Sequence, residues 1–124
     1  MRSKGEEIQQ RLIDFGARTT RVAKMLPRTD EGRYISQQQL MRSGLAPAPN
    51  YAEARAAESR ADFIHKLGVV QKELNETSVW LRILMRINLG KEDLLVAIYQ
   101  ENVELARIIT KSIMTARKRS EAPK

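Results

Sequence analysis

ADFIHKLGVVQKELNETSVWLRIL, residues 61–84, decides the fold, because it carries three nearly ideal heptads. Residues that recur at alternating intervals of four and three lie on one side of an α-helix, where they pack against neighbouring helices. The positions that follow this pattern are Phe63, Leu67, Val70, Leu74, Thr77, Leu81 and Leu84. Ser59 and Asp62 form a variant of the capping box, with aspartate in place of glutamate, so we expect the helix to begin there.

A second stripe on the same helix places two carboxylates among apolar residues. Glu73 and Glu76 precede Trp80 at helical spacing. A solvated surface is the ordinary interpretation of two acidic residues, but the apolar neighbours indicate that this face is covered. A covered carboxylate has to be paired or hydrogen-bonded. We therefore expect partial burial, with Arg42, Asn50 or basic residues of another subunit as partners.

Helices are also expected at the two ends of the chain. The first helix is marked by Ile8, Leu12, Phe15, Thr19, Val22 and Leu26, and the last by Leu95, Ile98, Leu105, Ile109 and Ile113. The first pattern predicts a helix over about residues 6–26, closed by Pro27. Gly90 stands where a helix C-terminal glycine belongs, and a helix over about residues 91–117 follows it.

The remaining helix lies between residues 29 and 58 and contains two prolines. The segment PRTDEGR is rich in turn formers and offers Thr29 or Asp30 as its N-cap. Pro47 and Pro49 remove two backbone donors and disfavour helix in the residues before them. We therefore expect a kink or break near residues 46–50.

These elements together predict an all-α fold. Helices joined by short connections pack antiparallel, so the simplest architecture is an up-and-down four-helix bundle whose second helix is kinked or broken near Pro47 and Pro49. A chain of 124 residues fits one domain, residues 1–124. Its ends, about residues 1–5 and 118–124, are expected to be frayed. No apolar/polar alternation bounded by hairpin turns predicts a strand.

The composition bounds the cellular context. The sequence has no cysteine, which excludes disulfides, thiolate metal sites and cysteine nucleophiles. Its N-terminal residues lack the apolar run of a signal peptide, and no apolar segment approaches membrane-spanning length. We expect a cytoplasmic protein with no membrane partner.

The sequence carries no recognisable catalytic or metal-binding pattern. A di-iron site in a four-helix bundle needs a Glu-x-x-His pair on each of two helices, but the chain has one histidine, His65, and no such pair. Phosphate-binding glycine loops, nucleophile elbows and metalloprotease helix motifs are also absent from the sequence. We expect no enzyme activity, no catalytic or metal-ligating residue and no cofactor.

A long central stretch resembles a known family. QLMRSGLAPAPNYAEARAAESRADFIHKLGVVQKELNETSVWL is similar to the motif core of the four helix bundle protein family, also called 23S rRNA-intervening sequence proteins. The similarity continues into ENVELARIITKSIMTARK and, more loosely, back to LPRTDEGRYIS. The matching positions are Arg42, Asn50, Glu53, Ala54, Ser59, Phe63, Lys72, Glu73, Glu76, Thr77, Trp80 and Leu81. The pair of prolines, Pro47 and Pro49, departs from the family pattern.

The resemblance implies an antiparallel bundle that assembles into a ring-like homopentamer, and it implies no catalytic residues. Some family members are encoded inside insertions in large-subunit ribosomal RNA genes, which suggests RNA association. The family is also similar in architecture to basic pentameric accessory proteins of diversity-generating retroelements, which is an analogy of fold only. The polar signature expected to shape the bundle or its interface comprises Arg42, Asn50, Glu53, Lys72, Glu73, Glu76 and Trp80.

Two hypotheses for function follow. A net charge of +7 and a pI near 10.1 favour an oligomer that binds RNA or DNA through a shared basic surface. Its candidate phosphate contacts are Arg11, Arg18, Arg21, Lys111, Arg117, Lys118 and Arg119. The alternative is a protein-interaction or scaffolding ring, in which basic residues only solubilise the protein or pair with acids four residues away. An aromatic content of 5% leaves few platforms for stacking single-stranded bases.

Overall fold

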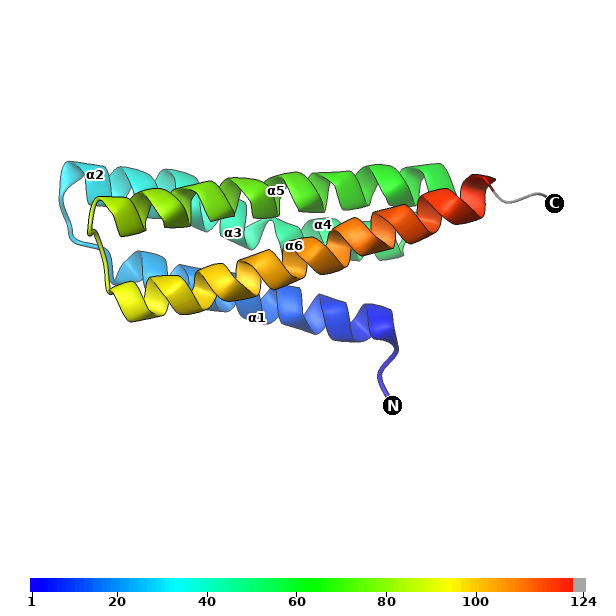
Figure 1. Cartoon of the computed structure of the whole chain (residues 1–124), viewed down its shortest axis with the longest axis horizontal. Coiled ribbons are helices and arrows are strands. Elements are labelled where there is room, and N and C mark those ends of the chain that lie inside the picture. The colour runs from blue at the N-terminus through cyan, green and yellow to red at the C-terminus, as the bar shows by residue number, and fades with distance from the viewer. Residues whose placement is uncertain (122–124) are drawn as a thin grey trace.

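Four antiparallel rods form the bundle, and the second rod is built from several short helical pieces (Figure 1). The computed structural model describes residues 1–121, which contain helices and turns and no strand. The elements are α1 (Lys4–Lys24), α2 (Asp30–Arg33), the π-helix η1 (Tyr34–Leu40), α3 (Met41–Leu45), α4 (Pro47–Arg55), α5 (Arg60–Arg86) and α6 (Glu92–Glu121). The predicted all-α four-helix bundle is therefore confirmed.

The order of the rods around the bundle follows from their contacts. Helix α5 packs against α4 and α6, whereas α1 packs against α3, α4 and α6. Helices α1 and α5 therefore lie diagonally opposite one another, as expected for consecutive rods that alternate in direction.

The heptad positions of α5 form the centre of the core. Leu67, Leu74, Leu81 and Leu84 are fully buried, and Thr77 lies buried in the same row. Phe63, the first position of the pattern, is only partly buried, because it lies near the end of the bundle. The stretch that predicted the fold thus provides the apolar face against which the second rod and α6 pack.

Side-chain caps set the starts of three helices. The hydroxyl of Ser3 accepts the amide of Glu6 at 3.1 Å, so α1 begins at Lys4, two residues before the expected start, and residues 4 and 5 are helical rather than frayed. Ser59 caps α5, as the sequence predicted, and of the two candidates Thr29 and Asp30 it is Thr29 that caps α2. At the other end of the chain, α6 continues to Glu121, so only residues 122–124 of the tail expected to be frayed lie outside the described residues.

The end of α5 corrects the prediction for Gly90. Asn88, with φ 54°, ends the helix in a Schellman motif, in which the amide of Leu89 donates to the carbonyl of Leu84 at 3.0 Å. Gly90, with φ 97°, lies two residues further along, in the turn toward α6. A Cβ at Gly90 would also lie 2.9 Å from Leu26, so the turn packs closely against the end of α1. Asparagine is the second commonest residue at such an end, so Asn88 could have been predicted to terminate α5.

The second rod is bent rather than broken at its prolines. Ala46 keeps helical angles, φ −67° and ψ −34°, and Pro47 serves as the first residue of α4. The carbonyl of Ala46 accepts both the backbone amide of Asn50, at 3.2 Å, and its side-chain amide, at 2.9 Å. Helical hydrogen bonding therefore continues across the bend.

The π-helix η1 was not expected from the sequence. Its wider turns are shown by the amide of Met41, which donates to the carbonyl of Ser36, five residues earlier. Ile35 and Leu40 are both buried although they are five residues apart, a spacing that an α-helix would place on different faces. The π-turns bring both side chains onto the core.

Gly44→Ala is expected to lower the free energy of unfolding by about 1–3 kcal/mol, because overpacking a tight contact has that cost. Gly44 is buried where α3 crosses α1, and an added Cβ would overlap the methyl group of Thr19. Urea denaturation at fixed protein concentration measures the change. Thr19→Ser in the same chain removes the methyl group and should recover part of the loss.

Gly68→Ala is the matched control. Gly68 lies inside α5, and a Cβ there would meet no atom within 4 Å. Because alanine has the higher helix propensity, this variant should gain about 0.5–1 kcal/mol. If Gly44→Ala and Gly68→Ala changed the free energy of unfolding by the same amount in the same direction, the close crossing of α1 and α3 would be contradicted.

Candidate functional site

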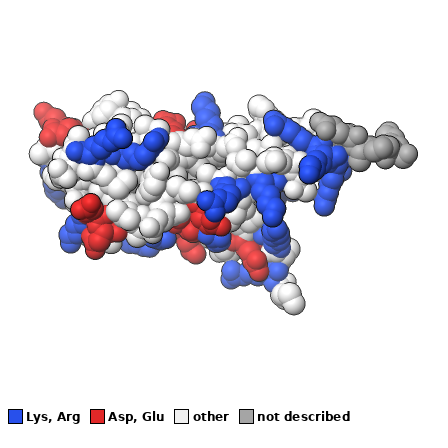
Figure 2. All heavy atoms as spheres, viewed as in Figure 1, with Lys and Arg blue, Asp and Glu red and all other residues white. Residues whose placement is uncertain are grey.

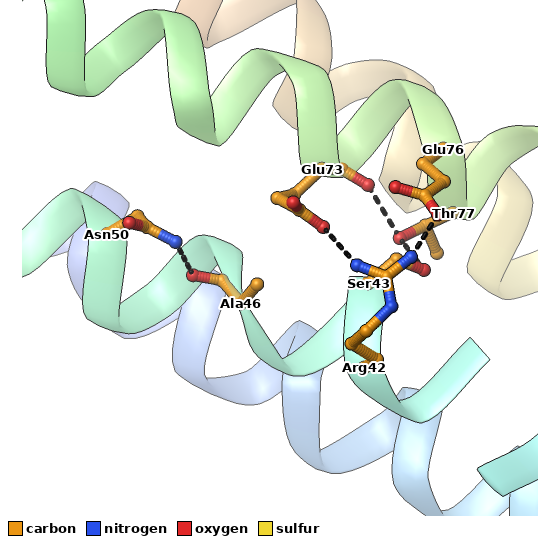
Figure 3. Close-up of polar contacts among 7 residues, drawn as sticks. All are labelled: Arg42, Ser43, Ala46, Asn50, Glu73, Glu76 and Thr77. Atoms are coloured by element: carbon orange, nitrogen blue, oxygen red, sulfur yellow. Dashed lines mark hydrogen bonds and ion pairs between the residues drawn. The ribbon is translucent and has the colours of Figure 1, made fainter. Parts of the chain in front are cut away.

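An ion-pair cluster joins the second rod to α5 (Figure 3). The guanidinium of Arg42, on α3, lies 3.4 Å from a carboxylate oxygen of Glu73 and also donates to Glu76. The side chain of Glu73 is 13% exposed and that of Glu76 is 32% exposed, whereas Arg42 is 49% exposed. The two carboxylates are thus partly buried and paired with one of the partners proposed from the sequence.

Two hydroxyl groups continue the cluster into the core. The hydroxyls of Ser43 and Thr77 are hydrogen-bonded to each other at 2.9 Å, and both residues are fully buried. Thr77 also lies 2.8 Å from the backbone carbonyl of Glu73, to which it donates. Each polar group in this region has a partner, as burial requires. We call Arg42, Ser43, Glu73, Glu76 and Thr77 together the Arg42 cluster.

The structure does not bring all residues of the polar signature together. Asn50 has no contact with the glutamates, because its amide covers the carbonyl of Ala46 at the bend. Glu53 forms an ion pair with Lys66 at 3.3 Å. Lys72 is exposed and forms no ion pair with any residue of the described part of the chain. Asn50, Glu53 and Lys72 therefore do not belong to the Arg42 cluster.

Trp80, on α5, contacts the second rod at the start of η1. Its ring meets that of Tyr34, the first residue of η1, edge to face, with centroids 6.2 Å apart. Trp80 is half-buried by this contact. Val79 and Ile83 on α5, and Ile87 at its C-cap, are spaced four residues apart and remain exposed.

The Arg42 cluster has the chemistry of a structural contact. Within residues 1–121, no group of three or more His, Cys, Asp or Glu side chains could hold a metal ion. No helix of the same residues is long and apolar enough to cross a bilayer. A positively charged group fixed between two acidic side chains sets the position of α3 along α5, since slipping the helices would leave charges without partners.

A second polar feature is a groove between the N-terminus of α1 and the C-terminal half of α6. It has a volume of about 490 Å³. Cations on its walls are Lys4, Arg107, Lys111 and Arg119, and its apolar lining includes Phe63, Ile108 and Ala116. Figure 2 shows that Lys and Arg side chains gather over this end of the molecule. We call this feature the basic groove.

Nearby acidic residues are already paired with cations. Glu104, the one carboxylate among the residues that line the groove, lies 3.4 Å from Arg107. Glu6, close to Lys4 in the chain, accepts hydrogen bonds from Gln10 and Arg55, and these bonds lower the pKa of its carboxyl group. The groove therefore keeps a surplus of positive charge.

The seven predicted phosphate contacts are distributed over three places. Lys111 and Arg119 line the basic groove, and Arg117 and Lys118 are exposed on the same turns of α6. Arg11 instead forms a 2.6 Å ion pair with Glu101, whose hydrogen bond raises the pKa of the guanidinium.

Arg18 and Arg21 lie apart from the basic groove. They line a separate depression near the other end of α1, together with Met25 and Leu94. Of the seven predicted contacts, only Lys111 and Arg119 therefore line the basic groove.

Sequence reasoning missed two cations of the groove. Arg107 precedes Lys111 by four residues, which places both on one side of α6, so helical spacing could have found it. Lys4 carries no such signal, because it is brought to the groove only by the packing of α1 beside α6.

Arg42→Met is expected to lower the free energy of unfolding by about 1–2 kcal/mol, since it leaves the mostly buried Glu73 without a cation while Arg42 itself is half exposed. Arg107→Met, which breaks the exposed pair with Glu104, should cost less than about 0.5 kcal/mol. Urea denaturation compares the two. Glu73→Gln added to the Arg42→Met chain should recover part of the larger loss of stability. Equal losses of stability in Arg42→Met and Arg107→Met would show that the Arg42 cluster does not fix the helices.

Comparison with known proteins agrees with the resemblance seen in the sequence. No curated protein matches the chain. The structure is similar to a crystal structure of a protein of unknown function from the S23 ribosomal protein family, from Bacteroides thetaiotaomicron VPI-5482. The two share 30% sequence identity and a TM-score of 0.82, and the match covers 90% of this chain and 99% of the other. The family model for 23S rRNA-intervening sequence protein matches residues 4–111. The chain therefore belongs to the 23S rRNA-intervening sequence protein family.

Proposed function

We propose that the protein is a non-enzymatic homo-oligomer that binds RNA or DNA through the phosphate backbone. The observation that carries the proposal is the basic groove, where four cations face one carboxylate that is already paired with Arg107. Lys118, seven residues after Lys111, is exposed on the same side of α6 and extends this positive surface. Positive charge concentrated at one end of a molecule attracts a polyanion and releases its counterions.

The lining of the groove favours contacts with phosphates over recognition of bases. Its polar groups are mainly long cationic side chains, which reach phosphate oxygens without reading sequence. Phe63 is the one aromatic side chain in the lining, so little stacking of single-stranded bases is available. We therefore expect binding to structured RNA or duplex DNA with weak dependence on sequence.

Homo-oligomer formation would strengthen such binding. Copies that present the basic groove on one assembly act at a high effective concentration, so several weak contacts add up to a stable complex. The exposed apolar residues Val79 and Ile83 on α5, with Ile87 at its C-cap, provide a surface that subunit contacts would bury. The ring-like homopentamer implied by the family resemblance is the assembly we propose.

Binding of a fluorescent RNA hairpin and of a DNA duplex, measured by anisotropy over a range of salt concentrations, tests the proposal. Lys111→Gln together with Arg119→Gln should lower the slope of log affinity against log salt by about 0.7–0.9 for each phosphate that the variant no longer neutralises. The matched control, Lys72→Gln with Lys91→Gln, removes the same charge outside the groove.

Two results would contradict nucleic-acid binding through the groove. One is the absence of association with either probe at low salt. The other is an equal loss of affinity in the groove variant and the control, which would assign the attraction to net charge alone.

A scaffolding ring without a nucleic-acid role is the second candidate, favoured by the exposed stripe of Val79, Ile83 and Ile87. Light scattering of the purified protein with and without nuclease treatment separates the two. A mass that stays at a fixed multiple of 14.2 kDa, no co-purifying nucleic acid and no binding of either probe would support the scaffold. Ile83→Glu should reduce the mass in both cases, and a monomer in the unsubstituted protein would remove the oligomer from both proposals.

A further inference from the structure

A second basic pocket lies at the opposite end of α1 from the basic groove. It has a volume of about 700 Å³ and is formed by the last turn of α1, the loop that follows, α2 and η1. Three cations line it, Lys24, Arg28 and Arg33, and no carboxylate does. Since Lys4 and Lys24 are twenty residues apart on one helix, the groove and the pocket are separated by about 30 Å.

The loop that carries these cations is held firmly. Arg33 donates to the backbone carbonyl of Arg28 at 3.0 Å, which fixes one edge of its guanidinium and leaves other N–H groups for a ligand. Gly32 is buried against the carbonyl of Pro27, where a Cβ would overlap it. Thr29 accepts the amide of Gly32 and caps the short helix. The loop backbone and the Arg33 guanidinium are thus held in place, whereas the side chains of Lys24 and Arg28 are free to turn toward a ligand.

Acidic residues of the same loop do not neutralise the pocket. Asp30 and Glu31 are exposed and do not line it. Among the residues that the structure describes, neither forms an ion pair with Lys24, Arg28 or Arg33. Clustered cations repel one another, so an arrangement without a counter-ion favours an anionic ligand.

The other walls indicate a ligand larger than a single phosphate. Leu26 and Met41 provide apolar surface, and Ser36 and Gln37, both on η1, provide polar groups. The volume falls in the usual range of small-molecule sites, which are mostly apolar with a few placed polar groups. Segments of π-helix are frequent at functional sites, and here the π-helix forms one wall.

We propose that this pocket binds a di- or triphosphate group attached to a small organic moiety, as in a nucleotide. Arg28 and Arg33 hold phosphate oxygens, since guanidinium groups suit bidentate contacts, and Lys24 contributes a third charge. The organic moiety lies against Leu26 and Met41. The phosphate chain belongs either to a free nucleotide or to the triphosphorylated end of an RNA. The proposal does not depend on the basic groove.

Isothermal titration calorimetry of the full chain with ATP, adenosine and inorganic tripolyphosphate tests this site. ATP and tripolyphosphate are expected to bind once per chain and adenosine weakly or not at all. Lys24→Gln with Arg28→Gln should weaken the binding of ATP and of tripolyphosphate at least about tenfold, because the variant loses two charge-assisted contacts to phosphate oxygens. The side chains of Lys24 and Arg28 make no hydrogen bond or ion pair within residues 1–121, so the double variant should fold. Arg33→Gln serves as a second variant.

Controls separate this site from the basic groove and identify the source of the phosphate. Lys72→Gln with Lys91→Gln, and the groove variant Lys111→Gln with Arg119→Gln, should both leave ATP binding unchanged. A 5′-triphosphate RNA that binds more tightly than both ATP and its 5′-hydroxyl form would assign the site to an RNA end. The proposal is overturned if neither ATP nor tripolyphosphate binds, or if the control variants lose as much affinity as the pocket variant.

Discussion

The burial of one side of α5 between α4 and α6 is the constraint on which the rest of the structure depends. Leu67, Leu74 and Leu81 lie fully inside, and burying one leucine side chain contributes about 1.5–3 kcal/mol. Because α5 occupies this place, α1 lies diagonally opposite it and packs against the second rod and α6. The basic groove between α1 and α6 is a consequence of that arrangement.

Hydrophobic burial has little direction, so polar contacts have to fix how far each helix slides along its neighbour. The Arg42 cluster does this between α3 and α5, and the ion pair of Arg11 with Glu101 joins α1 to α6. Buried amides add two more fixed points. Gln9 donates to the carbonyl of Ala48 at 2.9 Å, and Asn102 donates to the carbonyl of Leu74 at 3.1 Å. Each pair of neighbouring rods is thus held in register by a polar contact.

The sequence predicted those features that local patterns determine. The heptads of α5, the cap at Ser59 and the pairing of Glu73 and Glu76 follow from spacing and from the cost of burying charge. The sequence left the choice between Thr29 and Asp30 as a cap, and among Arg42, Asn50 and another subunit as the partner, to the structure. The π-helix was missed because its register depends on which residues the neighbouring rods bury. Lys4 was missed for the same reason, since only tertiary packing brings it to the groove. Local signals therefore specified the rods, and contacts between rods specified the candidate sites.

Native-state hydrogen exchange of the backbone amides tests most directly whether the buried side of α5 carries the fold. Amides over residues 67–84 should exchange only through global unfolding, so their protection should equal the full free energy of unfolding. Amides of α2 and of the last turns of α6, where most side chains are exposed, should exchange much faster. Exchange over residues 67–84 at the rate seen in α2 would contradict the account, because the buried side of α5 would then open while the rest of the bundle stayed folded.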